Sequence, residues 1–149
     1  MPNHVMNSMK VSGNSEKVDE FIEKSKGVGP WTGNKEKLSF AQFIRPPNKV
    51  TTSYDKYGYN WCNENWGTKW GAYDVEIEVS ENSDNYKVAR YFFRTAWSPP
   101  SLDVFRSFSS EFPNLKFEDV YNDPITELQG KIIAESGEAE VMEVNDENK

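Results

Sequence analysis

Residues 72–95, AYDVEIEVSENSDNYKVARYFFRT, contain the pattern that decides the fold. Apolar and acidic side chains alternate through residues 72–79, and strict alternation of this kind predicts a half-buried β-strand. The apolar face carries Tyr73, Val75, Ile77 and Val79, and the acidic face carries Asp74, Glu76 and Glu78. Residues 80–85 are polar and predict a turn, and residues 86–95 supply a second strand. The stretch therefore predicts an antiparallel hairpin.

On each side of this hairpin the pattern predicts strands and a helix. Upstream, residues 4–11 predict a strand, and we expect Ser15 to cap the helix that follows it. Downstream, we expect Ser101 to cap a second helix, and residues 115–121 and 128–134 predict two more strands. The fold class is therefore α+β, with the ferredoxin-like split βαβ order βαββαβ plus an extra strand. We expect an antiparallel sheet with two helices on one face, its other face open or covered by an aromatic-rich insert.

The chain is expected to form one domain over residues 1–136, with the insert at about residues 29–71. Within the insert, residues 38–44 predict a short strand or extended segment, and residues 48–58 predict a long, polar loop. Residues 137–149 are rich in glutamate and predict an acidic, disordered tail. Because this tail has few apolar groups to bury, we expect its deletion from residue 138 onward to leave the melting temperature nearly unchanged.

Composition limits the classes of partner. The 149 residues carry a net charge of -7, and the scattered basic residues disfavour direct binding of nucleic acid or of an anionic membrane. The single cysteine, Cys62, excludes an intrachain disulfide and a cysteine-based zinc site, and one histidine gives no histidine metal cluster, so we expect no metal and no cofactor. The sequence shows no signal peptide and no apolar run long enough to span a bilayer, which indicates a cytoplasmic protein.

A concentration of tryptophan marks the candidate binding site. Indole rings can stack on a nucleobase or another planar ring, nearby amide and hydroxyl groups can add hydrogen bonds, and a lysine can meet a phosphate. The alternative is that the tryptophans pack across the open sheet face as core, and the sequence leaves both interpretations open. For Trp97, a buried ring predicts a loss of about 3–5 kcal/mol on truncation to alanine, and a small loss indicates a ligand-facing ring. The candidate residues are Trp61, Asn65, Trp66, Thr68, Lys69, Trp70 and Trp97.

No combination of residues predicts catalysis. His4 is the only histidine and lies in the first predicted strand, and Cys62, between aromatic residues, is expected to be a small buried hydrophobe. The paired carboxylates of residues 74–78 fall on the polar face of a strand, where a general acid–base pair needs one desolvated carboxyl group. The stretch 95–100, TAWSPP, predicts a strand end before a helix, whose N-terminus can also hold an anion. We expect a protein that is not an enzyme.

Three stretches are similar to the Api92-like family, also described as YubB-like, of phages, plasmids and integrated elements. They are residues 1–13, MPNHVMNSMKVSG; 64–74, ENWGTKWGAYD; and 93–117, FRTAWSPPSLDVFRSFSSEFPNLKF. Two places depart from the family pattern. His4 and Val5 stand where the family often has Trp-Cys, and residues 122–130, NDPITELQG, stand where related proteins tend to be shorter. The resemblance implies a ferredoxin-like fold and a mobile-element origin, and it implies no activity.

The resulting hypothesis is a non-enzymatic phage or mobile-element accessory protein in the bacterial host cytoplasm. It would counteract host defence by stoichiometric binding, either of a nucleotide-derived immune signal or of a defence protein. One alternative is a protein-interaction or assembly module without a small-molecule ligand, and a second is a nucleotide-acting hydrolase. The sequence leaves the oligomeric state open, a homodimer included.

Overall fold

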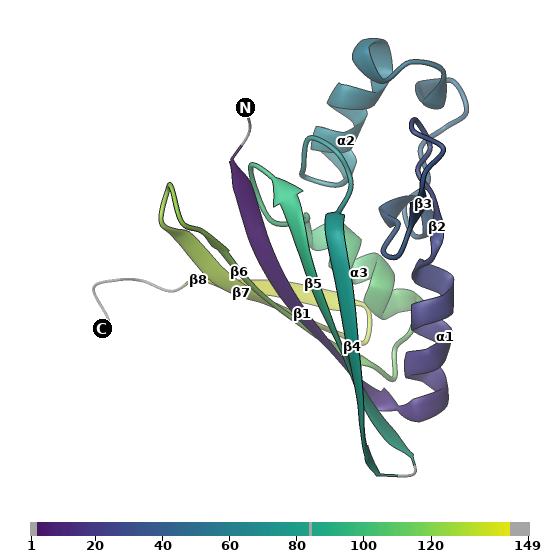
Figure 1. The fold of residues 1–149 in the computed structure, drawn as a ribbon, viewed down its shortest axis with the longest axis vertical. Helices are drawn as coiled ribbons and strands as arrows, with labels where there is room; N and C mark the ends of the chain where they lie inside the picture. The colour runs from purple at the N-terminus through teal and green to yellow at the C-terminus, as the bar shows by residue number, and fades with distance from the viewer. Residues whose placement is uncertain (1–2, 84, 144–149) are drawn as a thin grey trace.

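The computed structural model describes residues 3–83 and 85–143. One large sheet carries two helices on one face, and an insert lies beside one end of the sheet (Figure 1). The helices and strands of the sheet layer are β1 (His4–Asn14), α1 (Ser15–Ser25), β4 (Tyr73–Ser83), β5 (Tyr86–Ala96), α3 (Leu102–Glu111), β6 (Lys116–Asp123), β7 (Leu128–Glu135) and β8 (Glu138–Glu143). The insert between α1 and β4 contains β2 (Gly27–Val28), β3 (Lys35–Glu36) and α2 (Tyr59–Asn65).

The sheet has the order β4-β5-β1-β6-β7-β8, and every neighbouring pair is antiparallel. Its first four strands, together with α1 and α3, form the split βαβ arrangement, in which β1 and β5 are the central strands. The expected hairpin is β4–β5, where Ile77 lies opposite Tyr91 and Val79 opposite Ala89. The ferredoxin-like α+β fold expected from the sequence is confirmed.

The expectation of a disordered tail is wrong for residues 138–143, which form β8 and pair with residues 130–135 of β7. The hairpin turns at Ser136 and Gly137, whose φ angles of 52° and 83° are the left-handed pair that a tight hairpin turn needs. The Gly137 N–H also donates to Ser109 Oγ of α3 at 2.7 Å. The sheet therefore has two added strands instead of one, and residues 144–149 lie outside the described residues.

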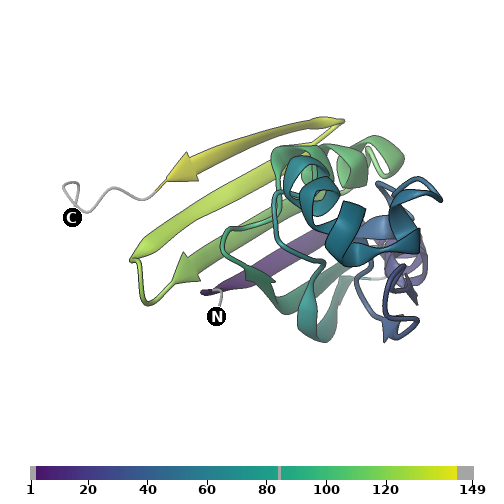
Figure 2. The ribbon, with the colours of Figure 1, turned by 90° about the horizontal axis from the view of Figure 1, so that it is seen from above.

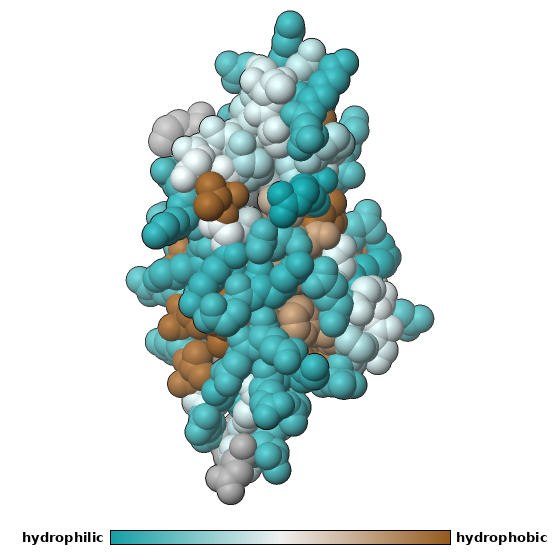
Figure 3. Space-filling view, turned by 90° about the vertical axis from the view of Figure 1, so that its right-hand side faces the viewer, coloured by the Kyte–Doolittle hydropathy of each residue, from teal (hydrophilic) through white to brown (hydrophobic). Residues whose placement is uncertain are grey.

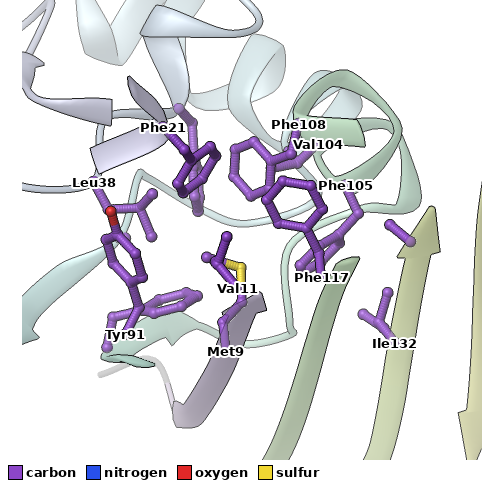
Figure 4. Close-up of a cluster of buried hydrophobic side chains, with 14 of the residues drawn as sticks. Met9, Val11, Phe21, Leu38, Tyr91, Val104, Phe105, Phe108, Phe117 and Ile132 are labelled. Atoms are coloured by element: carbon purple, nitrogen blue, oxygen red, sulfur yellow. The ribbon is translucent and has the colours of Figure 1, made fainter. Parts of the chain in front are cut away.

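The core lies between the sheet and the two helices (Figure 4). Phe21 of α1 is at its centre, with ring centroids 5.1 Å from Phe117 of β6, 5.4 Å from Phe108 of α3 and 5.8 Å from Tyr91 of β5. Edge-to-face contacts at these distances add to the hydrophobic stabilisation of the buried rings. Aromatic side chains thus fill the core, in place of aliphatic ones, at the point where both helices meet the sheet.

The insert packs on the helix side and leaves the other face of the sheet open. Phe43 lies 4.6 Å from the ring of Phe108 and 5.6 Å from that of Phe21, so the insert extends the layer formed by α1 and α3. The prediction of an extended segment at residues 38–44 is wrong in its centre, because Phe40–Gln42 forms a turn of 3-10 helix that buries Phe40. The side carrying α1 and the insert is mostly hydrophilic, with small separate apolar areas (Figure 3).

The segment expected to be a long loop is largely helical. Val50–Thr52 forms a 3-10 turn, and Tyr54–Gly58 forms a π-helical turn that runs directly into α2. In Figure 1, α2 lies past the end of the sheet at which β5 ends and β4 begins. The view from above shows α2 on the same side of the sheet as α3 (Figure 2). None of the helices in the described ranges combines the length and the apolar character needed to cross a membrane.

Candidate functional site: an aromatic–lysine patch

Two loops dock at the end of the sheet and bring distant residues together. The Ser101 N–H donates to Trp66 O at 2.8 Å, Ser101 Oγ donates to Asn65 O at 3.1 Å, and Ser98 Oγ donates to Gly67 O. Gly67 is required here because its φ is +75° and because a Cβ atom would lie 2.9 Å from Ser101 Cβ. The loop after α2 is therefore fixed against the loop after β5.

This docking produces a surface cluster that we call the aromatic–lysine patch, formed by Tyr59, Lys69, Trp70 and Trp97. Lys69 Nζ lies 4.9 Å from the ring centroid of Trp70 and 5.2 Å from that of Trp97. Both distances are within the range of a cation–π interaction. The Tyr59 ring contacts Trp97 edge-on at 6.1 Å. One ammonium group is thus held by two indoles from separate parts of the chain.

Trp97 is the most exposed member of the patch, with 42% of its surface accessible against 36% for Tyr59. The sequence left open whether this ring is buried, and the structure places it at the surface. Its φ is +74°, a left-handed conformation that costs energy for a bulky residue, and its N–H donates to Asn3 O at 2.9 Å. Strained residues of this kind cluster at functional sites. The surrounding hydrogen bonds hold the indole outward against this strain.

Tyr54 anchors the lysine side of the patch. Its hydroxyl donates to Lys69 O, and burial raises the pKa of this phenol to about 12, so it stays a donor at neutral pH. Its ring meets Trp31 edge-on at 5.4 Å. Gly58 is needed beside them because a Cβ atom would lie 2.8 Å from both rings. The π-helical turn therefore serves to position the Lys69 backbone.

The other candidate residues have structural contacts. Trp66 is only 2% exposed, and its Nε1–H donates to Ile44 O at 3.0 Å. Trp61 packs edge-on against Trp66 at 5.2 Å, Asn65 caps the end of α2 by donating to Trp61 O, and the buried Thr68 donates to Trp70 O. Of the seven candidates, the structure brings Lys69, Trp70 and Trp97 together at the surface and uses the other four to build the loop beneath them.

Sequence reasoning missed one member of the patch, one neighbour of it and one buried acid. Tyr59 and Tyr73 contact Trp97 and Trp70, and neither was named as a candidate. Asp119 is fully buried on β6, neither of its carboxylate oxygens has a partner among the described residues, and burial raises its pKa to about 8. The sequence did contain a signal for the burial of Asp119. Side chains two residues apart in a strand lie on the same face, and residue 119 alternates in step with Phe117 and Tyr121.

The residues that the sequence set aside as catalytic candidates have ordinary environments. Cys62 is buried, as expected, and burial raises the pKa of its thiol to about 12, which removes the reactive thiolate at neutral pH. His4 is exposed and hydrogen-bonds through Nδ1 with the Tyr73 hydroxyl. Glu76 and Glu78 are exposed on the open face. Over residues 3–83 and 85–143, no three histidine, cysteine or acidic side chains come together as metal ligands.

The split βαβ sheet with its aromatic insert defines a ferredoxin-like α+β domain whose surface cluster lies at one end of the sheet. A sequence profile described as the ferredoxin-like domain in Api92-like protein matches residues 56–149, which include α2, the patch and the strands from β4 to β8. The chain belongs to the Api92-like family.

A solved structure supports the same fold outside the profile match. The crystal structure of a protein api92 from Yersinia pseudotuberculosis is similar over 97% of this chain and 99% of that one, with a TM-score of 0.61 and 11% sequence identity. At this identity the likeness shows the fold alone. No curated protein matches the chain.

Proposed function

We propose that this protein is a non-enzymatic accessory protein of a phage or mobile element that counteracts bacterial defence by stoichiometric binding. Its ligand at the aromatic–lysine patch is a nucleotide-derived signal. The observation that carries the proposal is the Lys69 ammonium held at the surface by the indoles of Trp70 and Trp97. The chain belongs to the Api92-like family. The biological setting rests on the mobile-element origin that the sequence resemblance to this family implies.

The patch has the chemistry that a nucleotide needs. Stacking of a base on an aromatic side chain contributes about 1–3 kcal/mol, against about 0.5–2 kcal/mol for the cation–π contact that the base displaces. The released Lys69 ammonium then forms a charge-assisted hydrogen bond with the phosphate. We expect the exchange to be favourable because stacking and the charge-assisted hydrogen bond act together in place of the cation–π contact.

A fluorescence titration tests the proposal. Cyclic di- and trinucleotides and ADP-ribose derivatives are added to the protein, while tryptophan emission and the melting temperature are recorded. A ligand is expected to quench emission saturably and to raise the melting temperature by linkage. Trp97→Ala and Lys69→Gln should each abolish the response. Tyr86→Ala, an exposed aromatic residue on β5, and Lys49→Gln, a lysine 5.5 Å from the ring of Tyr57, serve as matched controls.

The ligand recovered after the titration separates sequestration from hydrolysis. Chemically unchanged nucleotide, recovered in the amount added, supports stoichiometric binding. Turnover of any member of the panel, lost in Lys69→Gln, would instead identify a nucleotide-acting hydrolase. The assay needs no knowledge of the natural signal, because each candidate is quantified before and after incubation.

The second candidate function is a protein-interaction module that grips a defence protein. It is favoured by the edge strand β8, where Val141 and Met142 are 45% and 46% exposed. Edge strands accept a partner strand through their free backbone groups. A host protein captured by wild type and by Trp97→Ala, but lost on the double substitution Val141→Lys and Met142→Lys, would favour this candidate.

A further inference from the structure

The aromatic–lysine patch continues onto the open face of the sheet. The Trp70 ring contacts Tyr73 of β4 at 6.3 Å, and the Tyr73 ring contacts His4 of β1 edge-on at 5.6 Å. Because β5 lies between β4 and β1, this pair bridges the middle strand. His4 shares its strand face with Met6, on the side opposite the buried Val5. A chain of contacts thus leads from Trp97 through the Lys69 ammonium to Trp70, and from there through Tyr73 to His4 on the open face.

A hollow of about 440 Å³ lies beyond this chain of contacts on the same face. Phe92 of β5 lines the hollow and is 36% exposed, and Arg94 lies two residues further along the same face of that strand. Arg94 is the cross-strand partner of both Tyr73 and Met6. The volume falls in the range of small-molecule sites. Asp74 and Glu76 of β4 also line the hollow.

We infer that the ligand of the patch is a dinucleotide, with one base on Trp97 and Trp70 and the second base on Phe92. This inference rests on the proposed function and narrows it. Phe92 lies two residues, about 7 Å, along β5 from Arg94, the cross-strand partner of Tyr73. The Tyr73 ring in turn lies 6.3 Å from that of Trp70, so one base does not reach both Phe92 and Trp70. Two bases joined through sugar and phosphate span that separation.

The charges of the aromatic–lysine patch and of the hollow fix the orientation of such a ligand. Lys69 and Arg94 are the cations available to a linking phosphate, while Asp74 and Glu76 line the hollow and repel one there. The Asp74 carboxylate lies 3.6 Å from the Arg94 guanidinium, which leaves part of the guanidinium fork for the ligand. Carboxylate oxygens accept hydrogen bonds from exocyclic amino groups. The second base is therefore one that carries such a group: adenine, guanine or cytosine.

Calorimetric titration of the full chain with adenosine monophosphate and with linear and cyclic diadenosine dinucleotides tests the inference. Each dinucleotide geometry is compared with the mononucleotide, and at least one should bind about 10-fold more tightly because a second base stacks. Phe92→Ser should remove this advantage and leave the mononucleotide affinity unchanged. Met142→Ser, an exposed apolar residue outside the hollow, is the matched control. Arg94→Gln should lower the affinity for the dinucleotide and leave the affinity for the mononucleotide unchanged.

Equal affinity for all three nucleotides, or a Phe92→Ser variant that keeps the dinucleotide advantage, overturns the inference and leaves the proposed nucleotide function standing. A wild-type protein that binds none of them overturns both. A circular dichroism spectrum and melting curve like those of wild type are required of each variant, and Phe92→Leu provides a second, more conservative variant that also lacks a ring to stack.

Discussion

Trp66 and Trp97 have the same side chain and opposite surroundings. Trp66 is enclosed by Trp31, Phe40 and Trp61, with its N–H donated to a backbone carbonyl, whereas Trp97 projects from a left-handed backbone position into solvent. Local sequence does not distinguish them, because the partners that bury one and hold the other outward come from distant segments. We therefore expect the two side chains to contribute very different amounts to the free energy of unfolding.

Trp66→Ala should lower the free energy of unfolding by about 3–5 kcal/mol, because it leaves a cavity and an unpaired Ile44 carbonyl. Trp97→Ala should cost less than about 1.5 kcal/mol, since part of the ring is already in water. Urea denaturation of both variants measures the difference. Similar losses would mean that Trp97 belongs to the core and would remove it from the binding site.

Asp119 predicts a pH dependence of stability. Burial raises the pKa of this carboxyl group from its ordinary value of 3.8 to about 8 in the folded protein. Because the folded state binds the proton more tightly, the associated stability is complete below about pH 4 and is lost as pH rises to about 8. The slope in this window approaches about 1.4 kcal/mol per pH unit.

Asp119→Asn keeps the shape and removes the titration, so its unfolding free energy should vary much less between about pH 5 and about pH 8 than that of wild type. Denaturation curves at several pH values make the comparison, with the exposed Asp55→Asn as control. Parallel pH profiles for wild type and Asp119→Asn would contradict the assignment of a protonated, buried carboxyl group.

Among the elements, α1 begins one residue earlier than the sequence suggested. Asn14, not Ser15, is the cap: its Oδ1 accepts from the N–H groups of Glu16 at 3.0 Å and Lys17 at 3.3 Å. Ser15 Oγ has no partner among the described residues. Both residue types favour the cap position, and the choice depends on the end of β1, where Asn14 still pairs with Tyr86.

Asn14→Ala should therefore destabilise the protein by about 1 kcal/mol, while Ser15→Ala should be within about 0.5 kcal/mol of wild type. Thermal unfolding of the two variants provides the measurement. A larger destabilisation by Ser15→Ala than by Asn14→Ala would identify Ser15 as the N-cap residue.

β8 illustrates where sequence reasoning failed at this scale. The alternation of Ala139 and Val141 with glutamates was present, as was a Ser-Gly turn before it, but the acidic composition outweighed the pattern. Ala139 packs against the core and pairs with Ala134 of β7, and α3 packs against both strands. The strand is stabilised by its neighbours more than by its own composition.

Truncation after Gly137 should accordingly lower the melting temperature by more than about 5 °C, because it removes a ladder of backbone hydrogen bonds and uncovers β7. Truncation after Glu143 retains all of β8 and serves as the control, with little change expected from its polar composition. Equal melting temperatures for the full chain and the shorter truncation would restore the interpretation of β8 as a dispensable tail.

For the whole molecule, the sequence predicted the ferredoxin-like order and the core-facing side of Val75 and Ile77 in β4, because periodicity is a local signal. It did not predict that the insert would join the helix layer, since that depends on Phe43 meeting Phe21 and Phe108 from three separate elements. The candidate site was recovered in part. Lys69 and Trp70 are adjacent in sequence, but only the docking of Gly67 against Ser101 brings Trp97 to them.

The most direct test of the central claim is mass spectrometry of the small molecules released by heat from protein purified out of bacteria with active nucleotide signalling. We expect wild type to release an intact nucleotide in an amount approaching that of the protein, and Trp97→Ala and Lys69→Gln to release none. Nucleotide absent from the wild type, or released equally by all three proteins, would contradict the claim that the aromatic–lysine patch binds such a ligand.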